Sequence, residues 1–352
     1  MDIASYLTKL KEESGSDLHL SAGVPPMMRI HGKLLPIEEK LLTKEDLHIL
    51  LYDILTDDQK AKFEANQEMD FSIELENIAR FRVNTFYQRR GEGVVFRIIP
   101  TTIKTIEELG LPATLLQFAH LHRGLVLVTG PTGSGKSTTL AALIDVVNSE
   151  REDHIITIED PIEFVHHNKK CMVNQREVGS HTQSFANALR AALREDPDVI
   201  LIGEMRDLET TAMAISAAET GHLVFATLHT NSAPQTVDRI IDIFPPHQQS
   251  QIRAQLSESL AGVVCQTLIR TIDGTGRVCS LEVMIGTPAV RALVREGKTH
   301  QLPSIIQTSA KMGMQSLDQN LKTLLMMGKI RGVDAYERAI NKEAFAQYSP
   351  VK

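Results

Sequence analysis

The segment from Gly130 to Thr138, GPTGSGKST, constrains the fold of this chain more than any other. It follows the apolar run LVLVTG and precedes the amphipathic run KSTTLAALIDVVNSE, so it joins a predicted buried strand to a predicted helix. The pattern G-x-x-x-x-G-K-[ST] in this position is typical of a loop whose backbone N–H groups surround the phosphates of a nucleotide. The sequence therefore predicts a nucleotide-binding α/β core with a mainly parallel sheet.

The residue types in this loop each have a physical role in binding phosphate. Glycines let the backbone turn its N–H groups inward, and the start of the following helix adds positive partial charge. Lys136 can reach the β- and γ-phosphates, and the hydroxyl of Ser137 can ligate Mg²⁺. We therefore predict that ATP and Mg²⁺ are bound by the residues of the loop: Gly130, Pro131, Thr132, Gly133, Ser134, Gly135, Lys136, Ser137 and Thr138.

The length of the chain and a change in its predicted secondary-structure pattern indicate two domains. A chain of 352 residues is long for one core. Residues 1–99 mix short helices with alternating strands such as ARFRVNTFYQ, which predicts an N-terminal α+β domain with an antiparallel sheet. Prolines and polar residues mark 100–112 as a linker. From residue 113 to residue 352, strands and helices alternate at first, and beyond Asn231 the chain is expected to be mostly helical.

Composition and charge exclude several classes of protein. The net charge of −7 gives no overall positive field for nucleic acid, although a local basic stripe stays possible. An apolar run long enough to span a membrane and the apolar core of a signal peptide are both lacking. The three cysteines are widely spaced, which predicts a cytosolic protein without disulfides. His166, His167 and Cys171 are too few for a zinc site, so we predict no zinc.

Polar side chains follow three predicted strands at the edge where ligands bind in an open parallel sheet. Glu204 follows VILIG, and His229 follows LVFATL. Glu159, Asp160 and Glu163 come just after HIITIE. A carboxylate here could order the water that attacks ATP, and the histidine could sense the γ-phosphate. Acids after strands also act as helix caps or solvated charges, and a single histidine is often only hydrogen-bonded, so these interpretations stay open.

The run VILIGEMRD departs from a common pattern. In many nucleotide hydrolases such a strand ends in an aspartate that helps to hold Mg²⁺. Gly203 stands at that position here, and Glu204 follows it. Two alternatives remain from the residues alone. Glu204 could act on the attacking water, and on Mg²⁺ through water, or the chain could be a nucleotide-binding scaffold without hydrolysis.

Four segments resemble the boxes of the secretion ATPase superfamily, whose members drive type II and type IV secretion and type IV pilus dynamics. They occur in the family's order: GPTGSGKST, ITIEDPIEFVH, VILIGEMRD and FATLHTN. In that family the strand of the third box ends in Gly-Glu, and this glutamate is taken as the catalytic acid. The resemblance therefore implies a catalytic role for Glu204, for Glu163 of the acidic box and for His229 of the histidine box.

The resemblance also implies an architecture and partners. It implies an α/β protein with a PAS-like N-terminal α+β domain, a RecA-like ATPase core and a mostly helical C-terminal part. Such a protein would form a homohexamer at the cytoplasmic face of the inner membrane, where it would act on a pilus platform protein and not on nucleic acid. A neighbouring subunit would complete the site with arginine. Arg82 and Arg97 are our candidates, with Arg80 and Arg90 behind them, and surface charge is the alternative role.

The segment AVRALVRE resembles a signature of the pilus-retraction branch of this superfamily. Thr287 and Pro288 precede an apolar face, and the stop at Gly297 completes a helix pattern. The resemblance implies a helix that couples hydrolysis to retraction and hence to twitching motility; its marked residues are Ala289, Arg291, Leu293 and Arg295. A solvated surface helix is the alternative. For the whole chain, accessory retraction, pilus extension, type II secretion and a nucleic-acid motor remain as other functions.

Overall fold

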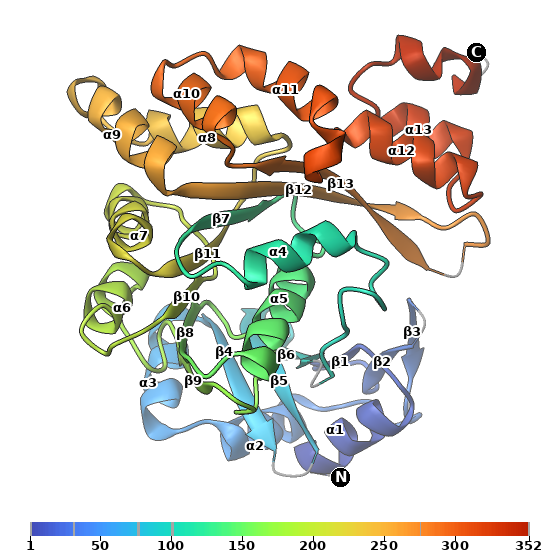
Figure 1. Cartoon of the computed structure of the whole chain (residues 1–352). Helices are drawn as coiled ribbons and strands as arrows, with labels where there is room; N and C mark the ends of the chain where they lie inside the picture. The colour runs from blue at the N-terminus through green and yellow to red at the C-terminus, as the bar shows by residue number, and fades with distance from the viewer. Residues whose placement is uncertain (1, 31, 76–77, 100–101, 275, 351–352) are drawn as a thin grey trace. The chain divides into compact units, whose positions relative to one another are not determined.

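The computed structural model describes residues 2–30, 32–75, 78–99, 102–274 and 276–350 (Figure 1). The chain divides into two compact units. The first comprises Met1–Thr102 and Glu163–Val165, and the second comprises Ile103–Ile162 and His166–Lys352. Residues 100 and 101 of the predicted linker lie outside the described residues, and its part from residue 103 to residue 112 belongs to the second unit.

The first unit is an α+β domain with an antiparallel sheet. Along β5, Phe81 and Val83 are fully buried while Asn84 is exposed, so one face of the strand packs against the core. The helices that accompany the sheet are α1 (Ile3–Glu12), α2 (Lys44–Ile54) and α3 (Asp57–Asn66). The described strands lie in the order β3 (Lys33–Pro36), β2 (Met27–Ile30), β1 (Asp17–Ser21), β6 (Gly91–Ile99), β5 (Ala79–Gln88) and β4 (Glu68–Leu75).

The second unit is built on a mainly parallel sheet, in which only β13 runs antiparallel to its neighbour among the described strands. The strand order is β13 (Arg277–Ile285), β12 (Leu260–Arg270), β7 (Gly124–Thr129), β11 (Leu223–Leu228), β10 (Val199–Ile202), β8 (His154–Glu159) and β9 (Met172–Glu177). This is the P-loop α/β core that the sequence predicts.

Helices connect these strands and cover the sheet (Figure 1). Those before β12 are α4 (Leu116–Ala119), α5 (Lys136–Glu150), α6 (Phe185–Ala192), α7 (Leu208–Thr220), α8 (Ala233–Asp242) and α9 (Pro246–Ser259). Those after β13 are α10 (Pro288–Arg295), α11 (Leu302–Thr308), α12 (Leu317–Met326) and α13 (Gly332–Arg338). Short 3₁₀ turns are η1 (Ala113–Leu115), η2 (Thr299–Gln301), η3 (Ala310–Met312) and η4 (Glu343–Tyr348). No helix in the described ranges combines the length and apolar character needed to cross a membrane.

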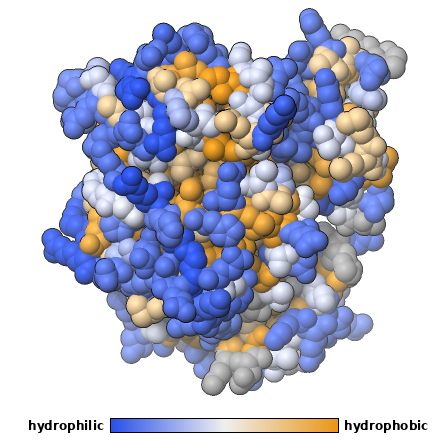
Figure 2. All heavy atoms as spheres, viewed as in Figure 1, coloured by the Kyte–Doolittle hydropathy of each residue, from blue (hydrophilic) through white to orange (hydrophobic). Residues whose placement is uncertain are grey.

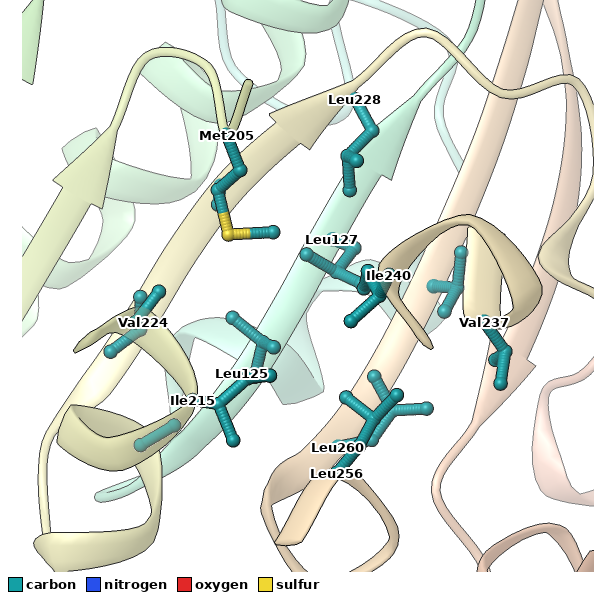
Figure 3. Packing of buried hydrophobic residues seen from close by; sticks show 14 of the residues in the cluster. Leu125, Leu127, Met205, Ile215, Val224, Leu228, Val237, Ile240, Leu256 and Leu260 are labelled. Carbon is teal, nitrogen blue, oxygen red and sulfur yellow. The ribbon is translucent and has the colours of Figure 1, made fainter. Parts of the chain in front are cut away.

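The central strands are buried on both faces because alternate residues enter two separate hydrophobic clusters. Leu125 and Leu127 of β7 face one cluster, while Val126 and Val128 face the other. In the first cluster, Ile240 of α8 packs with the strand residues (Figure 3). The outer surfaces over α6 and α7 are mainly hydrophilic (Figure 2), so these helices are amphipathic covers for the sheet.

The part beyond Asn231 contains helices, as expected, but also the hairpin of β12 and β13, which the sequence reasoning missed. Helix α9 ends at Ser259 and β12 begins at the next residue, Leu260, so there is no turn sequence to mark the change. Periodicity alone does not separate a short apolar run in a buried strand from one in a buried helix. The strand β12 pairs in parallel with β7, and this places it beside the phosphate loop.

Candidate active site

The phosphate loop joins β7 to α5, as the motif predicts. Its backbone requires glycine at Gly130, where φ is 140° and a Cβ atom would lie 2.2 Å from the carbonyl oxygen of Gln266. Gly133 and Gly135 also have positive φ values, of 76° and 89°. Within the described chain no side chain caps the first turn of α5, so its N–H groups are available to an anion.

Lys136 opens α5 and lies against the loop. Its Nζ donates to the carbonyl oxygens of Gly130, at 2.9 Å, and Pro131, at 3.3 Å. Ser137 follows it, half-buried in the first turn of the helix. The lysine and the hydroxyl therefore lie at the same helix N-terminus, where a phosphate group and its metal ion would be bound.

Glu204 lies at the same edge of the sheet, two residues beyond β10. Its carboxylate is 19% exposed and has two partners: Nη2 of Arg206 donates to Oε2 at 2.7 Å, and Nε2 of His229 lies 3.0 Å from Oε1. Burial raises the pKa of Glu204, but the hydrogen bond from Arg206 and the interaction with His229 outweigh it, and the pKa is lowered overall. The glutamate is therefore ionised at neutral pH.

His229 comes directly after β11, which lies between β7 and β10 in the sheet. Leu228 pairs with Thr129 at the end of β7, and Ala226 pairs with Ile202 at the end of β10. The imidazole therefore follows the strand between those that lead to the phosphate loop and to Glu204. The structure thus brings together two of the three predicted catalytic residues.

Gly203 has a steric explanation. A Cβ atom there would lie 3.2 Å from the carbonyl oxygen of Ile158 and 3.3 Å from the Cα of Glu159, closer than side chains normally pack. The aspartate that many nucleotide hydrolases carry at this position would not fit without movement of β8. Glu204, one residue later, has room for its carboxylate.

The three acidic residues after β8 lie in different environments. Oε1 of Glu159 accepts hydrogen bonds from Thr157, at 2.7 Å, and Gln175, at 3.3 Å. Asp160 is exposed. Glu163 is also exposed and belongs, with Phe164 and Val165, to the first compact unit. The second unit pairs Glu204 with His229, whereas Glu163 belongs to the first unit.

A pocket of about 620 Å³, lined by both polar and apolar side chains, extends from Glu204 and His229 to α8. The side of the pocket formed by α8 carries Asp238, Arg239 and Asp242, all exposed, while Val237, Ile240 and Ile241 hold the helix to the core. The sequence reasoning missed these charged residues, because they occupy the polar face of an ordinary amphipathic helix. Their only signal was their position a few residues after His229.

Arg82 and Arg97 lie in the first unit, directly opposite each other on β5 and β6. Nε of Arg82 donates to Oδ2 of Asp70 at 3.1 Å, and Nε of Arg97 donates to Oδ1 of Asp17 at 2.7 Å. Burial raises the pKa of Asp17, but hydrogen bonds from Ser16 and Arg97 lower it overall. Each candidate arginine thus has a carboxylate partner within its own subunit, and both remain substantially exposed, at 41% and 67%.

The AVRALVRE segment forms α10, capped by Thr287 as predicted. Arg291 donates to the carbonyl oxygens of Gly286, at 2.9 Å, and Glu258, at 2.8 Å, so it fastens the helix to its neighbours. Leu293 packs against the core, while Ala289 is exposed. Arg295 is 55% exposed and lies 3.3 Å from Oε1 of Glu258. Of the four marked residues, Ala289 and Arg295 are the ones most available to a partner.

Comparison with known proteins gives a consistent result over both units. Residues 2–331 match the family described as Type II/IV secretion system protein. A type IV pilus retractation ATPase, PilT, of Pseudomonas aeruginosa is 55% identical over 98% of this chain and 100% of its own. A twitching motility protein of Neisseria gonorrhoeae is 52% identical over 91% of this chain and 86% of its own. A crystal structure of the pilus retraction motor PilT with bound ADP, 47% identical, superposes with a TM-score of 0.93 over 99% of both chains.

Proposed function

Because this chain belongs to the type II/IV secretion system protein family, we propose that it is an ATPase motor that powers the retraction of type IV pili. The observation that carries the proposal is the full-length likeness to a pilus retraction ATPase, at 55% identity, in a chain whose Lys136, His229 and Glu204 follow three neighbouring strands. Retraction of pili disassembles them and would support twitching motility.

ATP would bind at the phosphate loop. The N–H groups of the loop and of the first turn of α5 would donate to phosphate oxygens, and Lys136 would exchange the carbonyl oxygens of Gly130 and Pro131 for the β- and γ-phosphates. The half-buried hydroxyl of Ser137 has the oxygen donor that Mg²⁺ prefers, and Glu204 would contact the ion through water. Mg²⁺, when bound, would neutralise charge on the phosphates.

Glu204 would orient the attacking water. Its carboxylate would accept a hydrogen bond from this water and so order it, or would take up its proton as the bond to phosphorus forms. Arg206 and His229 hold the two carboxylate oxygens and so fix its direction. His229 would pass the state of the γ-phosphate to α8, which begins four residues later. Glu163 remains a candidate second acid for this reaction.

The motor would work as a homohexamer at the cytoplasmic face of the inner membrane, with a pilus platform protein as its partner. Arg82 and Arg97 of a neighbouring subunit would leave Asp70 and Asp17 to reach the γ-phosphate. Such arginines raise hydrolysis rates on the order of 10³-fold or more. Helix α10 would transmit the resulting movement to the pilus machinery, through Ala289 and Arg295. Neither zinc nor nucleic acid has a part in this scheme.

Two experiments test the function. The purified oligomer should release phosphate from Mg-ATP, with no increase in rate when DNA is added; DNA-stimulated hydrolysis would instead indicate a nucleic-acid motor. Cells that lack the protein should carry excess pili and should not move by twitching. Cells without pili would indicate an extension motor, and normal pili with a loss of protein export would indicate type II secretion. Normal twitching in such cells would show that the protein is not the main retraction motor and is at most an accessory one.

A further inference from the structure

We propose that Gln266 is a positioning residue for the phosphate loop, which it holds in the shape that binds nucleotide. The inference rests on the proposed function, since it concerns the same nucleotide site. Gln266 lies on β12, the strand that the sequence reasoning missed. It is 3% exposed and lies outside all four sequence boxes that mark the family.

The strand β12 runs directly beside the phosphate loop. Cys265 pairs with Thr129, the last residue of β7, and the Oγ1 of Thr129 lies 2.9 Å from the Sγ of Cys265. Gln266 is the next residue on β12, and Gly130 is the next residue after β7. The carbonyl oxygen of Gln266 fills the space where a Cβ atom of Gly130 would lie, so strand and loop are in close contact.

The side chain of Gln266 makes a bond to the loop itself. Its Nε2 donates to the carbonyl oxygen of Ser134 at 2.8 Å. In a trans peptide the C=O and N–H groups point in opposite directions. Holding the Ser134 carbonyl toward β12 therefore turns the N–H of Gly135 away from β12. Gln266 thus orients a peptide of the segment whose N–H groups surround phosphate in this motif.

Two buried polar atoms that lack partners among the described residues suggest that the residue at position 266 is a glutamine for the sake of function and not of stability. Within the described part of the chain, the Oε1 of Gln266 and the Oγ of Ser134 have no hydrogen-bond partner. A buried polar atom without a partner is unfavourable, and a methionine would fill a similar volume without that cost. What glutamine provides, and methionine would not, is the bond to Ser134. The glutamine is therefore explained by control of the loop rather than by packing.

The experiment compares nucleotide affinity in the full-length oligomer with and without this bond. In Gln266→Met the volume is kept and the donor is lost. We expect the Kd for ADP and the KM for ATP to rise about tenfold, the change expected if the N–H of Gly135 loses one charge-assisted hydrogen bond to a phosphate oxygen. The kcat should change less than about threefold, because Gln266 acts on binding through the loop and touches no reacting atom.

The matched control is Gln315→Met. Gln315 also donates to a backbone carbonyl, that of Leu281 at 3.3 Å, but it does so at β13, two strands away from β7. A purely structural glutamine would lower the melting temperature and leave nucleotide affinity unchanged, which is the behaviour expected of this control. An equal loss of ADP affinity in both variants would overturn the proposal.

A second variant covers the case in which Gln266→Met does not assemble. Gln266→Glu keeps the shape, removes the donor and places a carboxylate beside the Ser134 carbonyl and the phosphates, so we expect a larger loss of ADP affinity. ADP affinity within twofold of the wild-type value in either variant would refute the inference. Titration with ADP needs no hydrolysis, so the inference is tested even if the wild-type protein proves to have no ATPase activity.

Discussion

At the scale of single residues, the charge of Glu204 is its important property. Glu204→Gln keeps the shape of the side chain and its contact with Arg206 but removes the negative charge that orients water. We expect kcat to fall by about 10²-fold or more, with ADP affinity unchanged within a few-fold. Phosphate release and ADP titration check this. Glu209→Gln, at an exposed glutamate paired with Arg190, is the control that should stay active. Hydrolysis at a near wild-type rate in Glu204→Gln would show that this assignment is wrong.

The same carboxylate should give a measurable pH dependence of stability. The pKa of Glu204 lies below its ordinary value of 4.5 in the folded protein, so its ion pair stabilises the fold at neutral pH. That contribution is fully present above pH 4.5 and is lost as the pH falls through the folded-state pKa. The difference in unfolding free energy between the wild type and Glu204→Gln should therefore shrink below pH 4.5. Urea unfolding across pH 3.5–7 measures it, and a difference that grows toward low pH would contradict the interaction.

Gly203 gives a third prediction at this scale. Gly203→Asp restores the acid found in many nucleotide hydrolases, but its Cβ would crowd Ile158 and Glu159. We expect the unfolding free energy to fall by about 1–3 kcal/mol, without a gain in hydrolysis. Gly276→Asp is a suitable control, because the nearest atom to its Cβ would be 3.9 Å away. A fully stable and active Gly203→Asp protein would show that β8 and β10 can separate freely.

At the scale of elements, two arginines of α10 are expected to have different roles: Arg291 supports the fold, and Arg295 couples hydrolysis to pilus retraction. Loss of the two carbonyl bonds in Arg291→Ala should lower the unfolding free energy by about 1–3 kcal/mol, so its phenotype mixes folding with function. Arg295→Gln removes only an exposed ion pair, which should cost less than about 1 kcal/mol. We expect Arg295→Gln to hydrolyse ATP normally while cells that carry it lose twitching. Normal twitching would exclude a coupling role for Arg295.

The elements that the sequence predicted well are those with long, unambiguous patterns. The strand β7, the loop and α5 follow from one motif in its context, and β10 and β11 are continuous apolar runs that carry Glu204 and His229 to one edge. The hairpin of β12 and β13 was missed, although Asp273-Gly274 between two apolar runs is a local hairpin signal. The pairing of β12 with β7, in contrast, is a long-range contact that leaves no local mark. Gln266 was missed for the same reason: only that pairing brings it to Ser134. The charged residues of α8 were missed because their pattern is that of any solvated helix surface.

At the scale of the whole molecule, the proposal requires that subunits complete each other's sites. Arg97→Ala should hydrolyse ATP slowly because it lacks the arginine that a neighbour supplies, and Glu204→Gln should do so because it lacks its own acid. In rings assembled from equal amounts of both proteins, about one interface in four joins an intact Glu204 to an intact Arg97 if mixing is random. The mixture should therefore recover clear activity that neither protein has alone.

The design of this mixing experiment separates assembly from catalysis. Arg89→Ala, at an exposed arginine between β5 and β6, should remain active alone and serves as the control for loss of positive charge on the first unit. Arg82→Ala, tested in the same way, decides which of the two paired arginines acts. If the mixture is no more active than the sum of its parts, although mass measurement shows mixed rings, then Arg97 does not act in a neighbouring site. Its bond to Asp17 would then be its whole role.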